Sequence, residues 1–158
     1  MRTIARKLIS HWEASSISIS IGVAEGQIRE FEHRYHVVMP LDIREYFLQV
    51  DGMQMTLNDC KDKEGFSFWP LRRVKTVKEE LNRSAGKYTE AKGAESFFVF
   101  ADYLDWSWAY AIYLSDDLST RNKVVLIGKG LPIEIADSFT DFVNLYLSDS
   151  PKLYGGNE

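Results

Sequence analysis

The sequence predicts an α+β fold with N-terminal helices, a mainly antiparallel twisted sheet and one closing C-terminal helix. Apolar residues recur at three- and four-residue spacing in the first third of the chain and again after residue 138, which is typical of amphipathic helices. Between residues 97 and 136, short strand-like runs lie too close together for parallel crossovers, so antiparallel pairing is favoured. At 158 residues the chain has the length of one domain, and we expect a single domain over residues 1–158.

The first helix is expected over residues 2–14, where Ile4, Leu8 and Trp12 share one face. Residues 15–21 then alternate serine with isoleucine. This alternation fits either a short edge strand or an extended connector whose isoleucines pack between helices. We favour the connector.

Two short helices are predicted next, separated by Pro40. Pro40 fits a helix start, because the N–H that proline lacks would be unpaired there. Gly52 is expected to end the second helix in the left-handed conformation. The apolar faces of the two helices contain Ile28, Phe31 and Tyr35, and then Ile43, Tyr46, Phe47 and Val50.

The remaining elements follow from local composition. Residues 53–64 and 82–96 read as loops, and residues 73–81 as a short helix. Ser138 is expected to cap the last helix, because Asp141 follows three residues later. Strands are expected at 97–101, 107–114, 123–127 and 133–136, with a glycine hairpin at 128–130 and a buried helical stripe of Phe139, Phe142, Val143 and Tyr146.

Aromatic residues supply most of the expected core. Phe47, Trp69, Phe100 and Phe142 each occupy the apolar phase of a predicted element. Strand alternation places Trp106, Trp108, Tyr110 and Ile112 on one face of the sheet and Ser107, Ala109 and Ala111 on the other. The large face is assigned to the core, and the small face suits close helix packing.

Bulk properties exclude several classes of protein. The single Cys60 rules out an intramolecular disulfide and fits a reducing compartment. No apolar run approaches the roughly 20 residues of a membrane span, so we expect a cytoplasmic protein without membrane contact. A net charge of −4 argues against direct nucleic-acid binding, which requires a basic surface.

Metal binding and catalysis are not expected. His33 and His36 have helical spacing, but His33 lies off the apolar face and no further ligands complete a site. Cys60 sits among acidic residues that raise a thiol pKa, and the Ser-x-x-Lys match at 84–87 lacks its companion motifs. We therefore predict no enzymatic activity, no cofactor and no metal. A hydrolase that uses Asp102 and Asp105 is the weakest hypothesis.

The candidate partner-binding residues surround the predicted turn after residue 101. Asp102 and Asp105 either bond to backbone N–H groups of the turn or, together with the neighbouring aromatics, form a corner that recognises a basic protein. Glu134 and Asp137 are possible acidic neighbours across the end of the sheet. The candidates are Asp102, Tyr103, Asp105, Trp106, Glu134 and Asp137.

The order of several segments resembles the SUKH superfamily, whose pattern runs I-x-x-F/A-E, then L-P-x-D-Y/I-R-x-F, then N/D-G. The corresponding residues here are 28–32, 39–47 and 51–52, with Met39 where the family usually has leucine. Later segments at 65–71, 97–103, 106–112 and 135–142 resemble the family's strands and the start of its last helix. The resemblance covers about residues 24–154.

The resemblance implies a function. The superfamily includes the yeast cell-wall regulator Knr and many bacterial immunity proteins. It implies a cytoplasmic immunity protein that neutralises a polymorphic toxin, often a nuclease, by direct stoichiometric binding. The alternative is an intracellular regulatory scaffold like the fungal branch. The expected partner is the cognate toxin, and the protein itself is expected to be a monomer or weak dimer.

Overall fold

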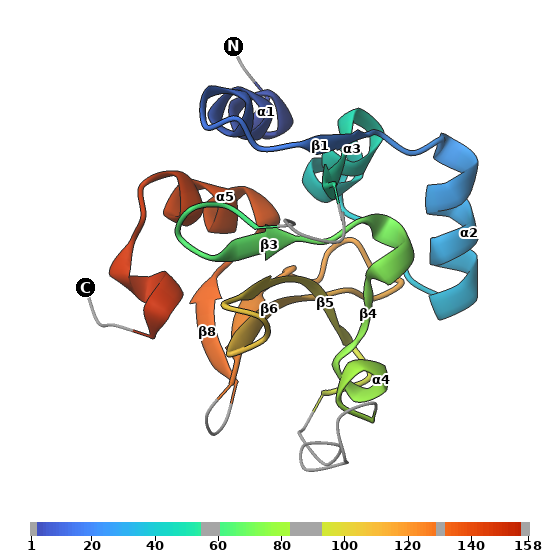
Figure 1. Cartoon of the computed structure of the whole chain (residues 1–158). Helices are drawn as coiled ribbons and strands as arrows, with labels where there is room; N and C mark the ends of the chain where they lie inside the picture. The colour runs from blue at the N-terminus through green and yellow to red at the C-terminus, as the bar shows by residue number, and fades with distance from the viewer. Residues whose placement is uncertain (1–2, 55–60, 83–92, 129–131, 156–158) are drawn as a thin grey trace.

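The computed structural model describes residues 3–54, 61–82, 93–128 and 132–155 (Figure 1). The helices are α1 (Ile4–Ala14), α2 (Glu25–Tyr35), α3 (Leu41–Gln49), α4 (Val77–Asn82) and α5 (Phe139–Leu147), with 3-10 turns η1 (Leu71–Arg73) and η2 (Pro151–Tyr154). The strands are β1 (Ile19–Ile21), β2 (Val50–Met53), β3 (Phe66–Phe68), β4 (Lys75–Thr76), β5 (Phe97–Tyr103), β6 (Trp108–Tyr113), β7 (Val124–Ile127) and β8 (Ile133–Ala136).

The main sheet has the order β3-β5-β6-β7-β8, and β4 pairs with β5 farther along the edge that β3 occupies. Every pairing in it is antiparallel. A separate antiparallel pair joins β1 to β2. The α+β class, the antiparallel sheet and the closing helix are thus confirmed. None of the described helices has the length and apolarity needed to cross a membrane.

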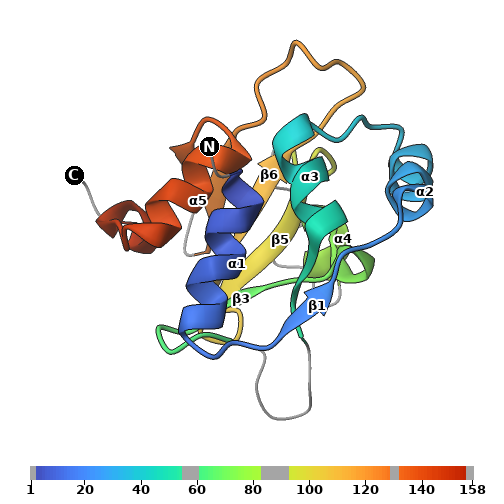
Figure 2. The same ribbon diagram turned by 90° about the horizontal axis from the view of Figure 1, so that it is seen from above.

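One face of the sheet is covered by α1, α3 and α5, which lie over β5 and β6 (Figure 2). Tyr110 and Ile112 of β6 point into this larger core. Ser138 caps α5 by accepting a hydrogen bond from the Asp141 N–H at 3.0 Å, as predicted. The four aromatic residues predicted for the core, Phe47, Trp69, Phe100 and Phe142, are all buried.

A smaller core lies on the opposite face of the sheet. There Trp69, with Val77 and Leu81 of α4, covers the small residues Ala109 and Ala111. The assignment of the large face to the core is therefore confirmed for Tyr110 and Ile112, and that face carries the large helices. Trp106 does not belong to this face, because it precedes β6 and lies in the turn with φ +68°.

A buried chain of hydrogen bonds joins the first helix, the last helix and the start of β3. The Trp12 indole N–H donates to the Tyr146 hydroxyl at 2.9 Å, and this hydroxyl donates to Asp62 Oδ2 at 2.5 Å. Asp62 Oδ1 accepts from the backbone N–H groups of Glu64, Gly65 and Phe66 at 2.8–3.0 Å. Burial and the Asp62 carboxylate raise the pKa of Tyr146, so its hydroxyl stays protonated.

Two local predictions were wrong. Residues 19–21 form strand β1, because they pair with β2, so the connector interpretation fails there. The helix expected at 73–81 begins only at Val77, since η1 and the short strand β4 precede it. Parts of the predicted loops at 53–64 and 82–96 and of the hairpin at 128–130 lie outside the described residues.

The role predicted for Gly52 was also wrong, although its φ is positive as expected, at +72°. Helix α3 ends at Gln49, and Gly52 lies inside β2. A Cβ atom at residue 52 would lie 2.7 Å from the backbone oxygen of Phe68 and 2.7 Å from the backbone of Trp69. Glycine is therefore required by the close approach of β2 to β3 as well as by its φ.

Replacing Gly52 by alanine is expected to lower the free energy of unfolding by at least about 2 kcal/mol, because strain and a backbone clash add. Gly26→Ala in α2 is the matched control, since its Cβ would meet no atom within 4 Å. Gly26→Ala should instead raise the free energy of unfolding by about 0.5–1 kcal/mol. Urea unfolding measures both, and equal effects would contradict this account of Gly52.

Tyr146→Phe is expected to lower the free energy of unfolding by about 2–4 kcal/mol, because it leaves the buried Trp12 N–H without an acceptor and removes a donor from Asp62. Tyr154→Phe removes only a hydroxyl that bonds the exposed Asp149, and should cost about 1 kcal/mol or less. Urea melts of the two variants compare these costs. A Tyr146 variant as stable as the Tyr154 variant would show that the buried chain is dispensable.

Candidate functional site

The turn between β5 and β6 has an unusual backbone. Leu104, Asp105 and Trp106 have φ values of +48°, +51° and +68°, although none is glycine. Left-handed conformations of such residues cost of order 1–3 kcal/mol each and persist only where surrounding contacts hold them. The hydrogen bonds from the Ser107 N–H to the carbonyls of Tyr103 and Leu104 close this turn at 2.9 and 3.1 Å.

Asp102 fixes the turn from inside the protein. Its Oδ2 accepts from the Trp106 backbone N–H at 2.7 Å, and its Oδ1 accepts from the Trp69 indole at 2.8 Å. Burial raises the pKa of Asp102, although the hydrogen bonds from Trp69 and Trp106 oppose the increase. The prediction that the turn's aspartates bond to backbone N–H groups is confirmed for Asp102. With 6% of its surface exposed, Asp102 positions the turn and offers little surface to a partner.

Asp105 and Trp106 have different environments. The Asp105 side chain is 81% exposed, and its carboxylate contacts the Lys61 ammonium at 2.8 Å. The Trp106 ring is partly buried against the smaller core, and its indole N–H donates to Glu80 Oε1 at 3.3 Å. The turn therefore presents one exposed carboxylate beside an anchored aromatic ring.

A polar hollow of about 220 Å³, which we call the turn pocket, opens beside this turn. It is lined by Lys61, Gly65, Ser67, Arg73, Asp102, Asp105 and Trp106. Arg73 lies over the Trp69 ring, 3.7 Å from its centroid, which is a cation–π contact. The buried Ser67 hydroxyl has no hydrogen-bond partner among the described residues. Charged side chains of both signs therefore surround the pocket.

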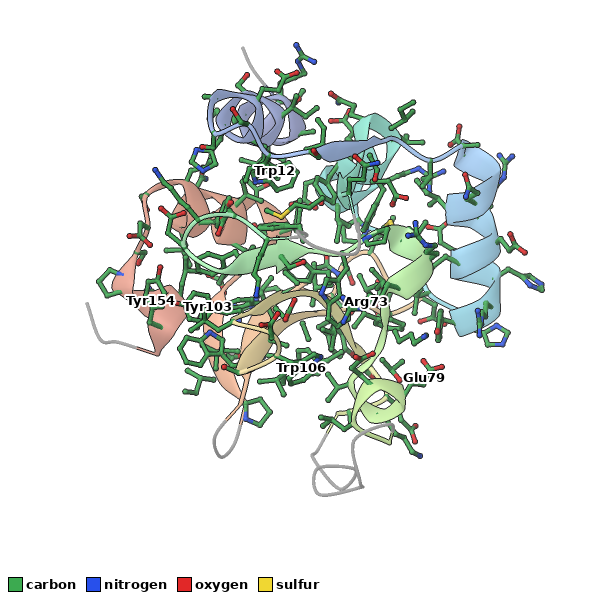
Figure 3. The ribbon with its side chains drawn as sticks, viewed as in Figure 1. Trp12, Arg73, Glu79, Tyr103, Trp106 and Tyr154 are labelled. Carbon is green, nitrogen blue, oxygen red and sulfur yellow. The ribbon has the colours of Figure 1, made fainter. Side chains whose placement is uncertain are left out.

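The other candidates lie elsewhere. Tyr103 stacks on Trp108, with the ring centroids 4.7 Å apart, and lies beside Tyr154. Trp106 lies on the opposite side of the sheet from Trp12 (Figure 3). Glu134 and Asp137 are separated from β5 by strands β6 and β7. They pair with Lys123 at 2.6 Å and with Arg121 at 3.6 Å, respectively. The structure thus brings together only Asp102, Asp105 and Trp106.

Sequence reasoning missed Lys61, Ser67 and Arg73. Ser67 did carry a signal, because it is a lone polar residue inside the apolar run 65–71. The place of its side chain depends on the pairing of β3 with β5, which puts Ser67 opposite Asp102. Lys61 and Arg73 carry no local signal, since their positions depend on contacts with residues far along the chain.

The structure offers no support for metal or paired-carboxylate chemistry in its described part. His33 and His36 are exposed, with ring centroids 6.4 Å apart. Within residues 3–54, 61–82, 93–128 and 132–155, no group of three or more His, Cys, Asp or Glu side chains could hold a metal ion. Asp102 bonds to Trp69 and Trp106 while Asp105 pairs with Lys61, so the two aspartates are not arranged as an acid–base pair. Cys60 and residues 84–87 lie outside the described residues.

The model of the SMI1 / KNR4 family (SUKH-1) matches residues 22–145. The chain belongs to this family. The match includes every residue that lines the turn pocket, and it confirms the resemblance drawn from the sequence segments. A search of curated proteins found no match to this SUKH chain.

Asp102→Asn tests how the turn is held in this SUKH protein. The amide keeps an oxygen for the Trp69 indole but presents an NH₂ group to the part-buried Trp106 N–H, so this donor loses its acceptor. The expected loss is about 1–3 kcal/mol in urea unfolding. A loss below about 0.5 kcal/mol would mean that the turn does not depend on this carboxylate.

The wild type and the Asp102→Asn variant should also differ in how their stability depends on pH. Because burial raises the pKa of Asp102 above 3.8, the folded protein binds this proton more tightly than the unfolded chain. The wild type should therefore lose stability relative to Asp102→Asn as the pH rises above about 4. Urea melts between about pH 3.5 and 7 measure this difference, and a difference independent of pH would contradict it.

Proposed function

We propose that this protein is a cytoplasmic immunity protein that neutralises a polymorphic toxin, such as a nuclease, by binding it stoichiometrically. Membership of the SUKH-1 family supports the proposal, because bacterial immunity proteins form much of the wider superfamily that the sequence resembles. The observation that supports it most directly is the preorganised turn at Leu104–Trp106, which offers an exposed carboxylate and an aromatic ring next to a polar pocket.

Preorganisation matters because a flexible turn would lose entropy on binding. Asp102 holds the backbone of Trp106, and Glu80 holds its indole, so the contact geometry exists before the toxin arrives. Interfaces concentrate their binding energy in a few anchors, among which tryptophan is enriched. A rigid anchor raises affinity mainly by lowering the cost of ordering.

Charge gives the turn a preferred partner. Asp105 projects into solvent, and the protein carries a net charge of −4. A basic toxin surface would be steered toward this carboxylate, and a toxin cation could share it with Lys61.

Asp105→Lys is the sharpest test of the turn, because the side chain is exposed and makes none of the hydrogen bonds that hold Asp102. We expect at least a tenfold loss of affinity for the toxin encoded alongside, mainly through slower association at low salt. Asp116→Lys, on an exposed loop after β6, is the control with the same change in charge. Calorimetry and stopped-flow association measure both.

Toxin binding that survives in Asp105→Lys as well as in the control would remove the turn from the interface. A folded wild type that neither binds nor protects against an adjacent toxin would contradict the immunity proposal itself. That second outcome would favour the regulatory scaffold, the other function found in the superfamily.

A further inference from the structure

A second hollow lies between helix α2 and the segment formed by η1 and β4. We call it the α2 groove, and its volume is about 330 Å³. Its apolar floor is made by Val23, Phe31, Leu71 and Val74, each only 6–9% exposed. A hollow of this size accommodates one or two side chains of a partner.

Three cations stand around this floor: Arg34 on α2, Arg72 on η1 and Lys75 on β4. None of them forms an ion pair within the described part of the chain; Arg34 lies over the Tyr35 ring at 5.5 Å. Arg44, by contrast, is bound by Glu25 at 2.6 Å and by Glu32 at 3.3 Å. Arg72 and Arg34 act through their charge on Asp51 and Glu79, but no salt bridge among the described residues holds the groove cations, so they can still bind an external carboxylate.

Two carboxylates also line the groove, but one of them is already used. Asp51 Oδ1 accepts the Leu71 backbone N–H at 2.7 Å, and burial raises the pKa of Asp51. Glu30 is the exposed acidic side chain of the lining. The cationic groups exceed the acidic ones in a protein that is acidic overall, so the groove differs in charge from the molecule around it.

The walls of the groove are held in place by bonds that do not involve the three cations. The Tyr35 hydroxyl donates to Glu79 Oε1 at 2.9 Å, and the Thr76 N–H donates to the same oxygen at 3.1 Å. The Val23 N–H donates to the Phe47 carbonyl at 2.8 Å. Arg72 and Lys75 take no part in these bonds, whereas Arg34 lies over the Tyr35 ring and its charge helps to lower the pKa of Glu79.

We propose that the α2 groove binds an acidic segment of a partner protein, with one apolar side chain on the floor and a neighbouring carboxylate against Arg34, Arg72 or Lys75. This contact is separate from the function proposed for the turn, because the charge it requires in the partner has the opposite sign. Apolar contact supplies the binding area, and the cations select acidic sequences over basic ones.

The test uses a library of random 12-residue peptides displayed on phage and selected on the full-length protein. Selected peptides should be enriched in Asp and Glu next to a Leu, Ile or Phe residue. One such synthetic peptide should bind the wild type at least tenfold more tightly than the double variant Arg72→Glu/Lys75→Glu, and its affinity should fall as salt rises. Fluorescence anisotropy measures the affinities.

Matched controls separate this groove from general charge effects. Lys63→Glu/Lys152→Glu makes the same change in net charge at exposed residues outside the groove, and should bind the peptide like the wild type. On α2 itself, Arg34→Glu should weaken binding while Arg29→Glu, which does not line the groove, should not. Thermal melts confirm that each variant is folded.

Three outcomes would overturn the proposal: selection that yields no binding peptide, selected peptides without acidic enrichment, or equal binding by the groove and control double variants. None of these outcomes bears on toxin binding by Asp105, which is measured with a different partner and different variants.

Discussion

The fold depends on one buried carboxylate. Asp62 receives three backbone N–H groups at the start of β3 through one oxygen and the Tyr146 hydroxyl through the other. Tyr146 in turn accepts from Trp12, so α1, α5 and the edge of the sheet are joined through a single side chain. Apolar burial is non-directional, whereas these hydrogen bonds are directional and help to specify how the helices sit on the sheet, because a buried polar group without a partner costs about 1–3 kcal/mol.

Local patterns predicted where the helices lie better than they predicted which distant residues come into contact. The periodicity of Ile4, Leu8 and Trp12 placed α1, and Ser138 placed the start of α5, because both signals act within a few residues. Gly52 was read correctly for its φ but wrongly for its role, since the constraint comes from Phe68 and Trp69 of another segment. Asp62 looked like an ordinary loop residue for the same reason: its partner Tyr146 lies 84 residues away.

At the candidate site, too, local features could be predicted from the sequence but contacts between distant residues could not. Uninterrupted alternation along β5 would place Asp102 on the same face as Phe98 and Phe100, but a bulge between Val99 and Ala101 changes the phase, and Asp102 turns toward Trp69. The left-handed residues after it then remove Trp106 from the face of β6. The sequence therefore identified the right turn and its aromatic–acidic character. It could not show which aspartate is buried, because that depends on the bulge and on the pairing of β3 with β5.

The 3-10 turn η1 relates the two candidate binding surfaces. Its consecutive residues Arg72 and Arg73 face different hollows: Arg72 lines the α2 groove, and Arg73 lines the turn pocket over Trp69. The bond from the Leu71 N–H to Asp51 holds this turn against β2. Because both arginines extend from one 3-10 turn that is bonded to β2, the backbone of η1 positions one wall of each hollow.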